Sequence, residues 1–218
     1  MKVLDVPSSG SVAGTTHSRN RFGQYVRTRA IPVNPNTGFQ GTVRGRLATN
    51  SAAWRAITAA QRAGWTDLAG GFTRTNSLGQ TYNMTGFMCY CSCNGNNLAA
   101  GNAAVPDAPA LVTPSTILTA VVTLTAAAFS IAYTPTPLAA GQRLFTYVSL
   151  QRSAGRAFEG DFRLLAISAA AAASPANVYA AYVARFGVPI LGNRIFIACR
   201  VYQAGFLSGP LTLSQVVA

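Results

Sequence analysis

Apolar and polar residues alternate on both sides of a turn signal near the start of the chain. The segment Asn20-Arg-Phe-Gly23 is typical of a tight turn, and alternation with a period of two over Ser11–Arg29 predicts a β-hairpin around it. Residues two apart on a strand share a face. The positions concerned are Tyr25, Arg27 and Arg29 on the second strand and Thr15, His17 and Arg19 on the first. We expect the hairpin to carry a basic face that contains an aromatic ring.

Two capping boxes predict helices after the hairpin. Thr37 stands three residues before Gln40, and Thr58 stands three residues before Gln61. In such a pair each side chain bonds the backbone N–H of the other residue at a helix start. We expect helices at about 38–56 and 59–69, joined at a sharp corner, and a third short helix at 87–97. The apolar positions expected to pack the corner are Trp54, Ile57, Trp65 and Leu68.

Short apolar runs bounded by glycine and proline dominate the second half of the chain. The expected strands cover residues 109–113, 118–124, 127–133, 143–151, 162–168, 193–202 and 211–217. Short strands at this spacing are typical of a β-sandwich. Val178, Tyr182 and Phe186 recur at helical spacing, which predicts one inserted helix at 176–186. Pro175 and Gly187 are its expected start and end.

The composition changes near residue 104, from segments rich in Gly, Asn and Arg to prolines followed by long runs of Ala, Val, Leu and Thr. We expect Gly95–Pro114 to be a linker, because clusters of Gly and Pro punctuate regular structure. The predicted domains are a basic docking domain over residues 1–100 and a β-sandwich over residues 101–218. The predicted fold class is an α+β N-terminal domain, built of a hairpin plus helices, followed by a mainly-β sandwich domain with one inserted helix.

The uncharged stretch from Ala108 to Gln142 contains the most membrane-like segment, Ile117–Tyr133. A helix that spans a bilayer needs about 20 apolar residues, and this segment is shorter and contains four Thr or Ser residues. A buried strand pair is therefore favoured over a membrane span. The first ten residues lack the apolar core of a secretory signal. We expect the protein in a virion or an extracellular assembly, or otherwise in the cytoplasm.

Five acidic residues and one histidine stand against 17 basic residues, for a formal net charge of +12. General acid–base and metal-assisted catalysis need carboxylates, imidazoles or thiolates placed together. Only Glu159 and Asp161 are close in sequence, and a solvated, ion-paired turn is favoured there over a catalytic dyad because Arg156 and Arg163 flank them. His17 lies in a polar stretch with no evident catalytic partner. We therefore expect no catalytic residues, no cofactor and no enzymatic activity.

Arginine accounts for 16 of the 17 basic residues, and ten of the 17 lie within the first 74 residues. Its guanidinium binds carboxylate and phosphate through paired hydrogen bonds. The candidate docking or phosphate-binding residues are Arg19, Arg21, Arg27, Arg29, Tyr25, Arg44, Arg46, Arg55 and Arg62. Docking to an acidic protein surface is favoured over nucleic-acid binding, because no motif of sequence-specific readout is present. A genome composition that favours Arg and Ala codons is an alternative origin of the excess.

Three cysteines at every second position, Cys89, Cys91 and Cys93, form the most conspicuous local pattern. They are candidate metal ligands, with Cys199 as a fourth. Structural zinc sites usually place two or more residues between paired cysteines, and on a helix Cys89 and Cys93 share a face while Cys91 points away. We therefore favour small buried thiols over a metal site, and expect no disulfide framework.

Four segments of the first half form a connected set of motifs. They are Arg21–Arg27 (RFGQYVR), Pro32–Thr37 with Gln40, Trp54–Thr58 with Gln61, Arg62 and Trp65, and Gly86-Phe87 with Asn94. From Gly14 to about Asn97 the chain thus resembles a poorly characterised domain found in bacterial and phage-like genomes. The function of that domain is unassigned, so the resemblance implies no catalytic residues.

The last two expected strands, Arg194–Tyr202 and Leu211–Val217, are joined by a turn through Gly205 and Gly209. From about Ala108 to Val217 the chain is similar in this respect to a fibronectin type III or immunoglobulin-like sandwich. The similarity implies a fold and no function.

These features predict a non-enzymatic structural or assembly protein. The expected forms are a virion component, such as a capsid-decorating, tail or fibre protein, or a filament-forming surface protein, docking through an Arg-rich face. Charged residues make up 10% of the chain, against about 25% in soluble domains, which suits a chain that buries surface in an oligomer. The expected partners are other protein subunits of a homo- or hetero-assembly. The alternative is a sequence-tolerant nucleic-acid-binding module.

Overall fold

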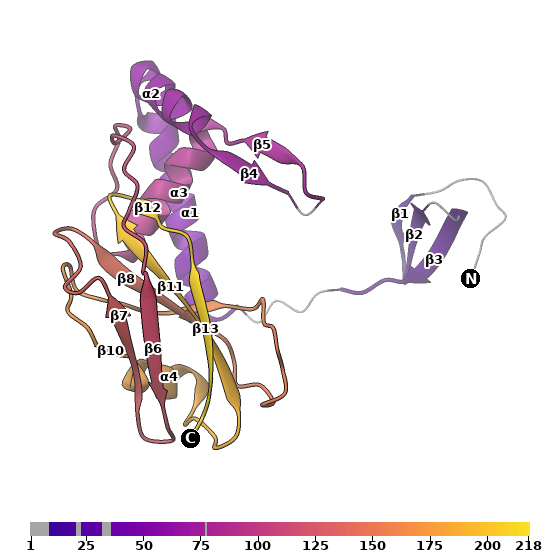
Figure 1. Cartoon of the computed structure of the whole chain (residues 1–218). Helices are drawn as coiled ribbons and strands as arrows, with labels where there is room; N and C mark the ends of the chain where they lie inside the picture. Colours follow the sequence, from indigo (N-terminus) through magenta and orange to yellow (C-terminus); the bar gives the residue numbers. More distant parts are fainter. Residues whose placement is uncertain (1–8, 21–22, 32–35, 77) are drawn as a thin grey trace. The chain divides into compact units, whose positions relative to one another are not determined.

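The structure is a computed structural model that describes residues 9–20, 23–31, 36–76 and 78–218 (Figure 1). The chain divides into two compact units, Met1–Thr42 and Val43–Ala218.

The first unit contains an antiparallel three-stranded sheet in the order β1–β2–β3. Its strands are β1 (Gly10–Val12), β2 (Thr15–Asn20) and β3 (Gly23–Thr28). The predicted hairpin is confirmed in β2 and β3, which pair along their whole length from Thr15 with Thr28 to Asn20 with Gly23. The middle of the predicted turn, Arg21 and Phe22, lies outside the described residues.

The three predicted helices are confirmed as α1 (Gly38–Ala56), α2 (Ala59–Gly70) and α3 (Gly86–Ala99). Both capping boxes are formed. At the start of α2, Gln61 N donates to Thr58 Oγ1 (3.2 Å) and Thr58 N donates to Gln61 Oε1 (2.9 Å). The same reciprocal bonds join Thr37 and Gln40 at the start of α1. The third helix is longer than predicted, because it continues to Ala99.

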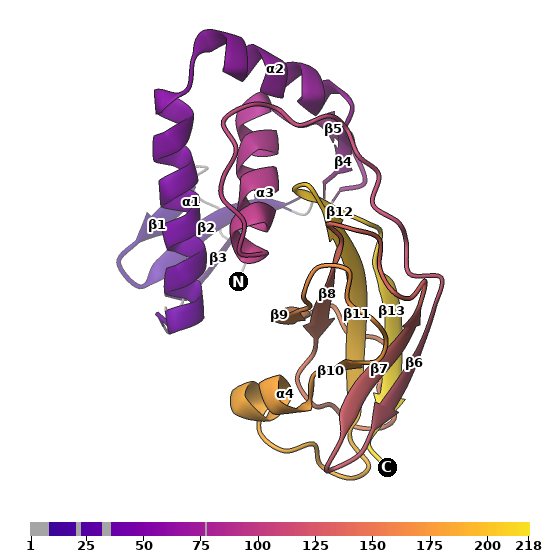
Figure 2. The ribbon, with the colours of Figure 1, turned by 90° about the vertical axis from the view of Figure 1, so that its left-hand side faces the viewer.

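The helices of the second unit pack around Trp65, which is fully buried. Its ring meets that of Tyr90 edge-on at 5.2 Å between centroids, and its Nε1–H donates to the Pro106 carbonyl (2.8 Å). In Figure 2 the axis of α2 crosses that of α3. The two helices approach closely at Gly86, where a Cβ would lie 2.6 Å from Thr66 Oγ1. Glycine is required there because a side chain would force α2 and α3 apart.

A small hairpin that the sequence pattern did not predict joins α2 to α3. Its strands are β4 (Thr73–Thr75) and β5 (Thr81–Asn83). Between them, Asn76 Oδ1 accepts hydrogen bonds from the backbone N–H groups of Leu78 and Gln80. Both strands are only three exposed residues long, so they carry no alternation of apolar and polar positions from which to recognise them.

Two antiparallel sheets follow the helices (Figures 1 and 2). One has the order β10–β7–β6, from β6 (Thr119–Leu124), β7 (Phe129–Thr134) and β10 (Ala176–Asn177). In the other, β9 pairs with β8, β8 with β11, and β11 with both β12 and β13. The strands of this sheet are β8 (Arg143–Val148), β9 (Arg163–Ile167), β11 (Arg194–Gln203), β12 (Phe206–Leu207) and β13 (Leu211–Val216).

Both sheets contribute to one apolar core. Ile131 of β7, Leu144 of β8 and Ile197 of β11 belong to the same buried cluster. Helix α4 (Tyr179–Phe186) adds Tyr182, whose ring packs edge-on against Phe129 at 5.4 Å. The described chain is therefore mixed α+β: a hairpin and helices precede antiparallel sheets with one short helix.

Three expectations need correction at element boundaries. Residues 109–113 form no strand. The helix predicted at 176–186 begins only at Tyr179, because Ala176 and Asn177 pair with β7 as β10. Within the predicted linker Gly95–Pro114, residues 95–99 belong to α3. The remainder is held in place, since Val105 exchanges two hydrogen bonds with the buried Asn94 side chain (2.8 and 3.0 Å).

Helix α3 is joined to the larger sheet by a polar network around Tyr202. The Tyr202 hydroxyl donates to Asn97 Oδ1 (2.6 Å) and accepts from Asn102 Nδ2 (2.9 Å), while its ring stacks on Phe145 at 5.3 Å. At Gly205, with φ +90°, a Cβ would lie 3.1 Å from Cys93 Cβ. The helices and the sheets thus pack together within the unit Val43–Ala218. The predicted division into domains 1–100 and 101–218 remains a prediction.

The uncharged stretch 108–142 forms β6, β7 and the segments around them, as the preference for a strand pair predicted. Among the described residues, no helix combines the length and the apolar character that crossing a bilayer requires.

We predict that Tyr202→Phe lowers the free energy of unfolding by about 1–3 kcal/mol. The substitution removes the hydroxyl that donates to the buried side-chain oxygen Asn97 Oδ1, but it keeps the ring that stacks on Phe145. Urea denaturation followed by circular dichroism measures the change. Tyr82→Phe is the matched control, since Tyr82 is 42% exposed on β5. A loss no larger than that of Tyr82→Phe would show that the network contributes nothing.

Candidate docking surfaces and a pocket lined by arginines

The hairpin register distributes the predicted basic residues over two faces. Tyr25 lies opposite Ser18 and Arg27 opposite Thr16, whereas Arg19 lies opposite Gln24. Directly paired residues share a face, so Arg19 and Tyr25 point to opposite sides. The expectation that the alternating positions of both strands form one basic face is therefore wrong: Thr15, His17 and Arg19 lie on the face opposite to that of Tyr25 and Arg27. Arg29 follows the end of β3, where its backbone N–H donates to the Gly14 carbonyl (2.8 Å), and Arg21 lies outside the described residues.

Arg62 holds the corner between α1 and α2. Its Nε donates to the Trp54 carbonyl (3.3 Å) and its Nη2 to the Arg55 carbonyl (2.8 Å). These carbonyls belong to the last turn of α1, where backbone acceptors lack partners within the helix. The guanidinium also places positive charge at the negative end of the helix dipole. Arg62 thus has a structural role at the corner.

Helix α1 exposes apolar side chains between arginines. Val43 is 47% exposed and Leu47 is 55% exposed, and Phe39, one turn earlier, is 46% exposed. Positions four apart lie on one side of a helix. Arg44 and Arg46 flank the line from Val43 to Leu47 on its two sides. We call the surface of Val43, Arg44, Arg46 and Leu47 the α1 face. Packing within the unit comes from the other end of the helix, where Trp54 contacts Tyr90 at 5.3 Å between centroids.

The ion pairs whose two partners are both described lie close together between Arg152 and Arg163. Glu159 is 4% exposed and pairs with Arg152 and with Arg156 (3.5 Å), and Asp161 pairs with Arg163 (3.2 Å). The predicted ion-paired turn is confirmed, although Glu159 is buried rather than solvated. Hydrogen bonds from the Asp161 backbone N–H, then from Arg152 and the Gly160 N–H, hold the pKa of Glu159 below its usual value against the opposing effect of burial. Its carboxylate is committed to organising this loop.

The cysteines on α3 are arranged as the helical spacing predicts. Cys89 and Cys93 are buried and hydrogen-bonded to each other, and Cys91 is only partly buried. The Cys93 hydrogen bond, together with the Arg74 charge, lowers the pKa of the Cys89 thiol although burial opposes the shift. Cys199 lies in the core between the two sheets, where burial raises the pKa of its thiol to about 11. All four thiols are free, and the described residues contain no group of three or more His, Cys, Asp or Glu side chains placed to bind a metal.

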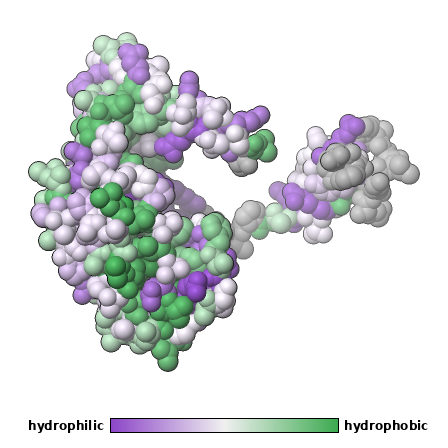
Figure 3. Space-filling view, in the orientation of Figure 1, coloured by the Kyte–Doolittle hydropathy of each residue, from purple (hydrophilic) through white to green (hydrophobic). Residues whose placement is uncertain are grey.

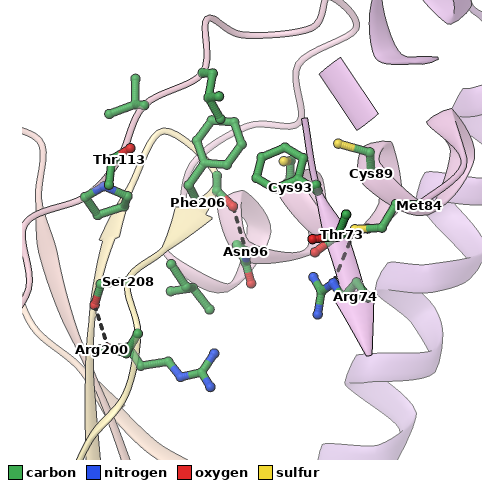
Figure 4. A pocket seen from close by; sticks show the side chains of 18 of the residues that line it. Thr73, Arg74, Met84, Cys89, Cys93, Asn96, Thr113, Arg200, Phe206 and Ser208 are labelled. Carbon is green, nitrogen blue, oxygen red and sulfur yellow. Dashed lines mark hydrogen bonds between the residues drawn. The ribbon is translucent and has the colours of Figure 1, made fainter. Parts of the chain in front are cut away.

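A pocket of about 570 Å³ lies beside α3, within the unit Val43–Ala218 (Figure 4). Its walls come from β4, α3, the segment Leu111–Pro114 and the end of the larger sheet around β12. Arg74 projects from β4 and Arg200 from β11. Arg74 is exposed, and its Nε donates to Met84 Sδ (3.3 Å), while Arg200 is half-buried. No acidic side chain is among the lining residues.

The pocket also has an apolar wall and neutral polar groups. Phe72 and Phe206 stack on each other at 5.7 Å between centroids, and Leu111 beside them is 57% exposed. Thr73 and Ser92, which carry hydroxyl groups, are also among the lining residues. The Asn96 side chain fixes one edge of the pocket, since its Nδ2 donates to the Gly205 carbonyl (2.8 Å). A cationic and partly apolar recess of this kind suits a ligand that carries both a negative charge and an apolar group.

Sequence reasoning missed Arg74 and Arg200 because they are far apart in the chain and belong to no local motif. One signal was present for Arg200. On β11 the odd positions from Ile195 to Val201 face the core between the sheets, so Arg200 must lie on the opposite face. The short strand β4 offered no comparable pattern for Arg74.

No family model and no curated protein matches the chain. The resemblances of residues 14–97 and of the second half therefore remain predictions.

We predict that Glu159→Gln lowers the urea midpoint at pH 7 and that the difference from wild type shrinks as the pH falls below about 4. The pKa of Glu159 is lower in the folded protein than in the unfolded chain, so the ionised carboxylate stabilises the fold above the unfolded pKa. This contribution is lost as the pH falls through the folded pKa.

Urea titrations at several pH values measure the difference. Asp161→Asn is the matched control, because Asp161 is 52% exposed and forms a single ion pair. A difference for Glu159→Gln that stays constant with pH would contradict the assignment.

Proposed function

We propose that the protein is a non-enzymatic structural component of a protein assembly that docks to an acidic neighbouring subunit through its arginine-bearing surfaces. The class of protein that we propose is a virion component, such as a capsid-decorating, tail or fibre protein, or a filament-forming surface protein. The observation that carries the proposal is the α1 face, where Val43 and Leu47 are exposed between Arg44 and Arg46.

The distribution of charge supports a partner outside the chain. Three of the four described acids are engaged locally: Glu159 and Asp161 pair with neighbouring arginines, and Asp107 accepts a hydrogen bond from Gln61 (3.0 Å). With 17 basic residues against five acids, the chain carries a formal net charge of +12. The complementary negative charge is then supplied by another molecule, which gives both affinity and orientation.

Exposed apolar side chains on the sheets support burial in an assembly. In Figure 3 apolar surface gathers over β6 and the segment before it. Leu118, just before β6, is 72% exposed, and Val121 on β6 is 68% exposed. Strand β6 is an edge strand that pairs only with β7 within its sheet. Exposed edges and apolar patches of this kind are normally covered by a partner.

The strand order supports the proposed similarity of the second half to a fibronectin type III or immunoglobulin-like sandwich. If β6, β7, β8, β9, β10, β11 and β13 are lettered A, B, C, C′, E, F and G, one sheet has the order A–B–E and the other C′–C–F–G. Immunoglobulin-like folds place A, B and E together in one sheet and C, F and G in the other. Such a module serves as a spacer or an exposed knob in the proposed assembly.

The second candidate function is a sequence-tolerant nucleic-acid-binding module. It is favoured by one observation, that Tyr25 and Arg27 share a face of the hairpin, where an aromatic ring and a guanidinium together suit a base and its phosphate. We rank it below docking because no base-reading motif accompanies the pair.

We predict that Val43→Ser combined with Leu47→Ser weakens association by about tenfold or more while the thermal unfolding midpoint stays close to wild type. Both side chains are about half exposed, so serine costs little in the isolated chain but removes apolar area from the interface. Analytical ultracentrifugation and electron microscopy of the full chain measure association. Mass spectrometry of the purified virions or filaments measures how much of the variant they incorporate.

Leu78→Ser is the matched control, since Leu78 is 81% exposed outside α1. A protein that stays monomeric at high concentration and is absent from particles contradicts the proposal. Binding of a DNA or RNA oligomer that weakens steeply as salt rises supports the second candidate instead.

A further inference from the structure

We propose that the pocket beside α3 binds an acidic peptide segment of a partner protein, with a carboxylate held by Arg74 and Arg200 and an apolar side chain against the wall of Phe72 and Phe206. The inference rests on the proposed assembly function for the identity of the partner as a protein. It adds a second contact site, formed by residues that are distinct from the α1 face.

The positive charges of the two arginines favour the binding of an anion inside the pocket. Arg74 and Arg200 both line it, and none of its lining residues is acidic. The described acids are Asp67, Asp107, Glu159 and Asp161, and none of them lines this cavity. Like charges on the walls of one concave site raise its positive potential, and a bound anion lowers the electrostatic free energy. A carboxylate accepts paired hydrogen bonds from a guanidinium, which makes arginine a strong partner for it.

The positive charge of Arg74 acts on another residue that lines the pocket. Its charge contributes to lowering the pKa of the Cys89 thiol, which lies on the α3 wall. The Arg74 Nε is engaged by Met84 Sδ, which leaves the Nη groups of the fork for a ligand. The Arg74 guanidinium therefore acts on the interior of the pocket rather than only on bulk solvent.

The apolar wall sets the second requirement for the ligand. Phe72 and Phe206 form a stacked pair at 5.7 Å, and Leu111 extends this wall with an exposed side chain. A pocket of about 570 Å³ is much larger than a carboxylate or a phosphate group alone needs. A peptide that places an apolar residue next to an acidic one fills both halves of the site.

The aromatic geometry favours a peptide over a nucleic acid. Single-stranded nucleic acids are held by bases that stack on accessible aromatic faces. Here Phe206 is only 7% exposed, and Phe72 covers one face of its ring. The aromatic pair therefore offers side-chain packing but no open platform for a base.

A second copy of this chain is a poor occupant. The chain has five acidic residues, and Glu159 and Asp161 are already paired within their own loop. A second copy would also bring mainly positive charge to a site that is already positive. The occupant is therefore a different and acidic protein.

The test is fluorescence anisotropy of the full chain with a fluorescein-labelled peptide of the sequence Asp-Glu-Leu-Asp-Glu. We expect saturable binding that Arg74→Gln and Arg200→Gln each weaken by about tenfold, because each removes charge-assisted hydrogen bonds. Replacing the peptide's leucine by serine should weaken binding as well. Arg163→Gln is the matched control: it removes the same charge from a 44% exposed position on β9 that does not line the pocket, and should change the affinity by less than about twofold.

Three results would overturn the inference. They are failure of the acidic peptide to bind the wild-type chain, binding that Arg74→Gln and Arg200→Gln leave unchanged, and tighter binding of an oligo-thymidine that the same two variants abolish. Thermal unfolding checks the variants. If Arg200→Gln does not fold, Arg74→Gln decides, because Arg74 lies on an exposed hairpin outside the core.

The pocket and the proposed assembly function can fail separately. Val43→Ser with Leu47→Ser changes only the α1 face, whereas Arg74→Gln changes only the pocket. If Val43→Ser with Leu47→Ser is lost from virions or filaments but still binds the peptide, the α1 face is needed for assembly independently of the pocket. Intact association of the wild-type chain without peptide binding rejects the pocket alone.

Discussion

The contact between α3 and the end of β11 is the constraint on which the arrangement of the second unit depends. The Tyr202 hydroxyl bonds the buried Asn97, and the backbone at Gly205 approaches Cys93 so closely that no side chain fits between them. Asn94 extends the junction by binding Val105 of the following segment. The helices thereby gain a fixed position against the larger sheet, and the pocket exists because its walls belong to both partners of this junction.

Because acidic groups are few, the arginines of the molecule have different kinds of partner in different places. Where acids occur, as at Glu159, they are engaged by neighbouring arginines and organise a loop. Elsewhere arginines take backbone acceptors, as Arg62 does at the end of α1, or line a cavity with no counter-charge, as Arg74 and Arg200 do. An excess of guanidinium groups over carboxylates is tolerable in the isolated chain because most of these side chains reach water. The same excess would supply the attraction for the acidic partner that we propose.

The α1 face and the pocket offer different kinds of contact. The α1 face presents apolar side chains between cations on an exposed helix, which suits a broad contact between subunits. The pocket is concave and suits a short segment of chain with one charge and one apolar group. An assembly protein that uses both would combine a large surface contact with a local, charge-selective one, and the second contact would add orientation to the affinity of the first.

Local patterns in the sequence were sufficient for the elements whose signals are local. The capping boxes at Thr37 and Thr58, the turn-flanked alternation of β2 and β3, and the apolar runs of β6, β7, β8 and β11 all depend on residues within a few positions of each other. Helical spacing likewise placed Cys89 and Cys93 on one face of α3.

Features that depend on distant pairing were decided only by the tertiary structure. The register of β2 with β3 separated Arg19 from Tyr25, because a strand's partner, and not its own alternation, determines which residues share a face with it. Ala176 and Asn177 became a strand because β7 offered them a free edge. Arg74 and Arg200 came to line one pocket only through the packing of α3 on the sheet, an arrangement set by Asn97, Tyr202 and Gly205. The sequence by itself thus determined the elements and the excess of positive charge, while long-range packing decided where that charge is concentrated.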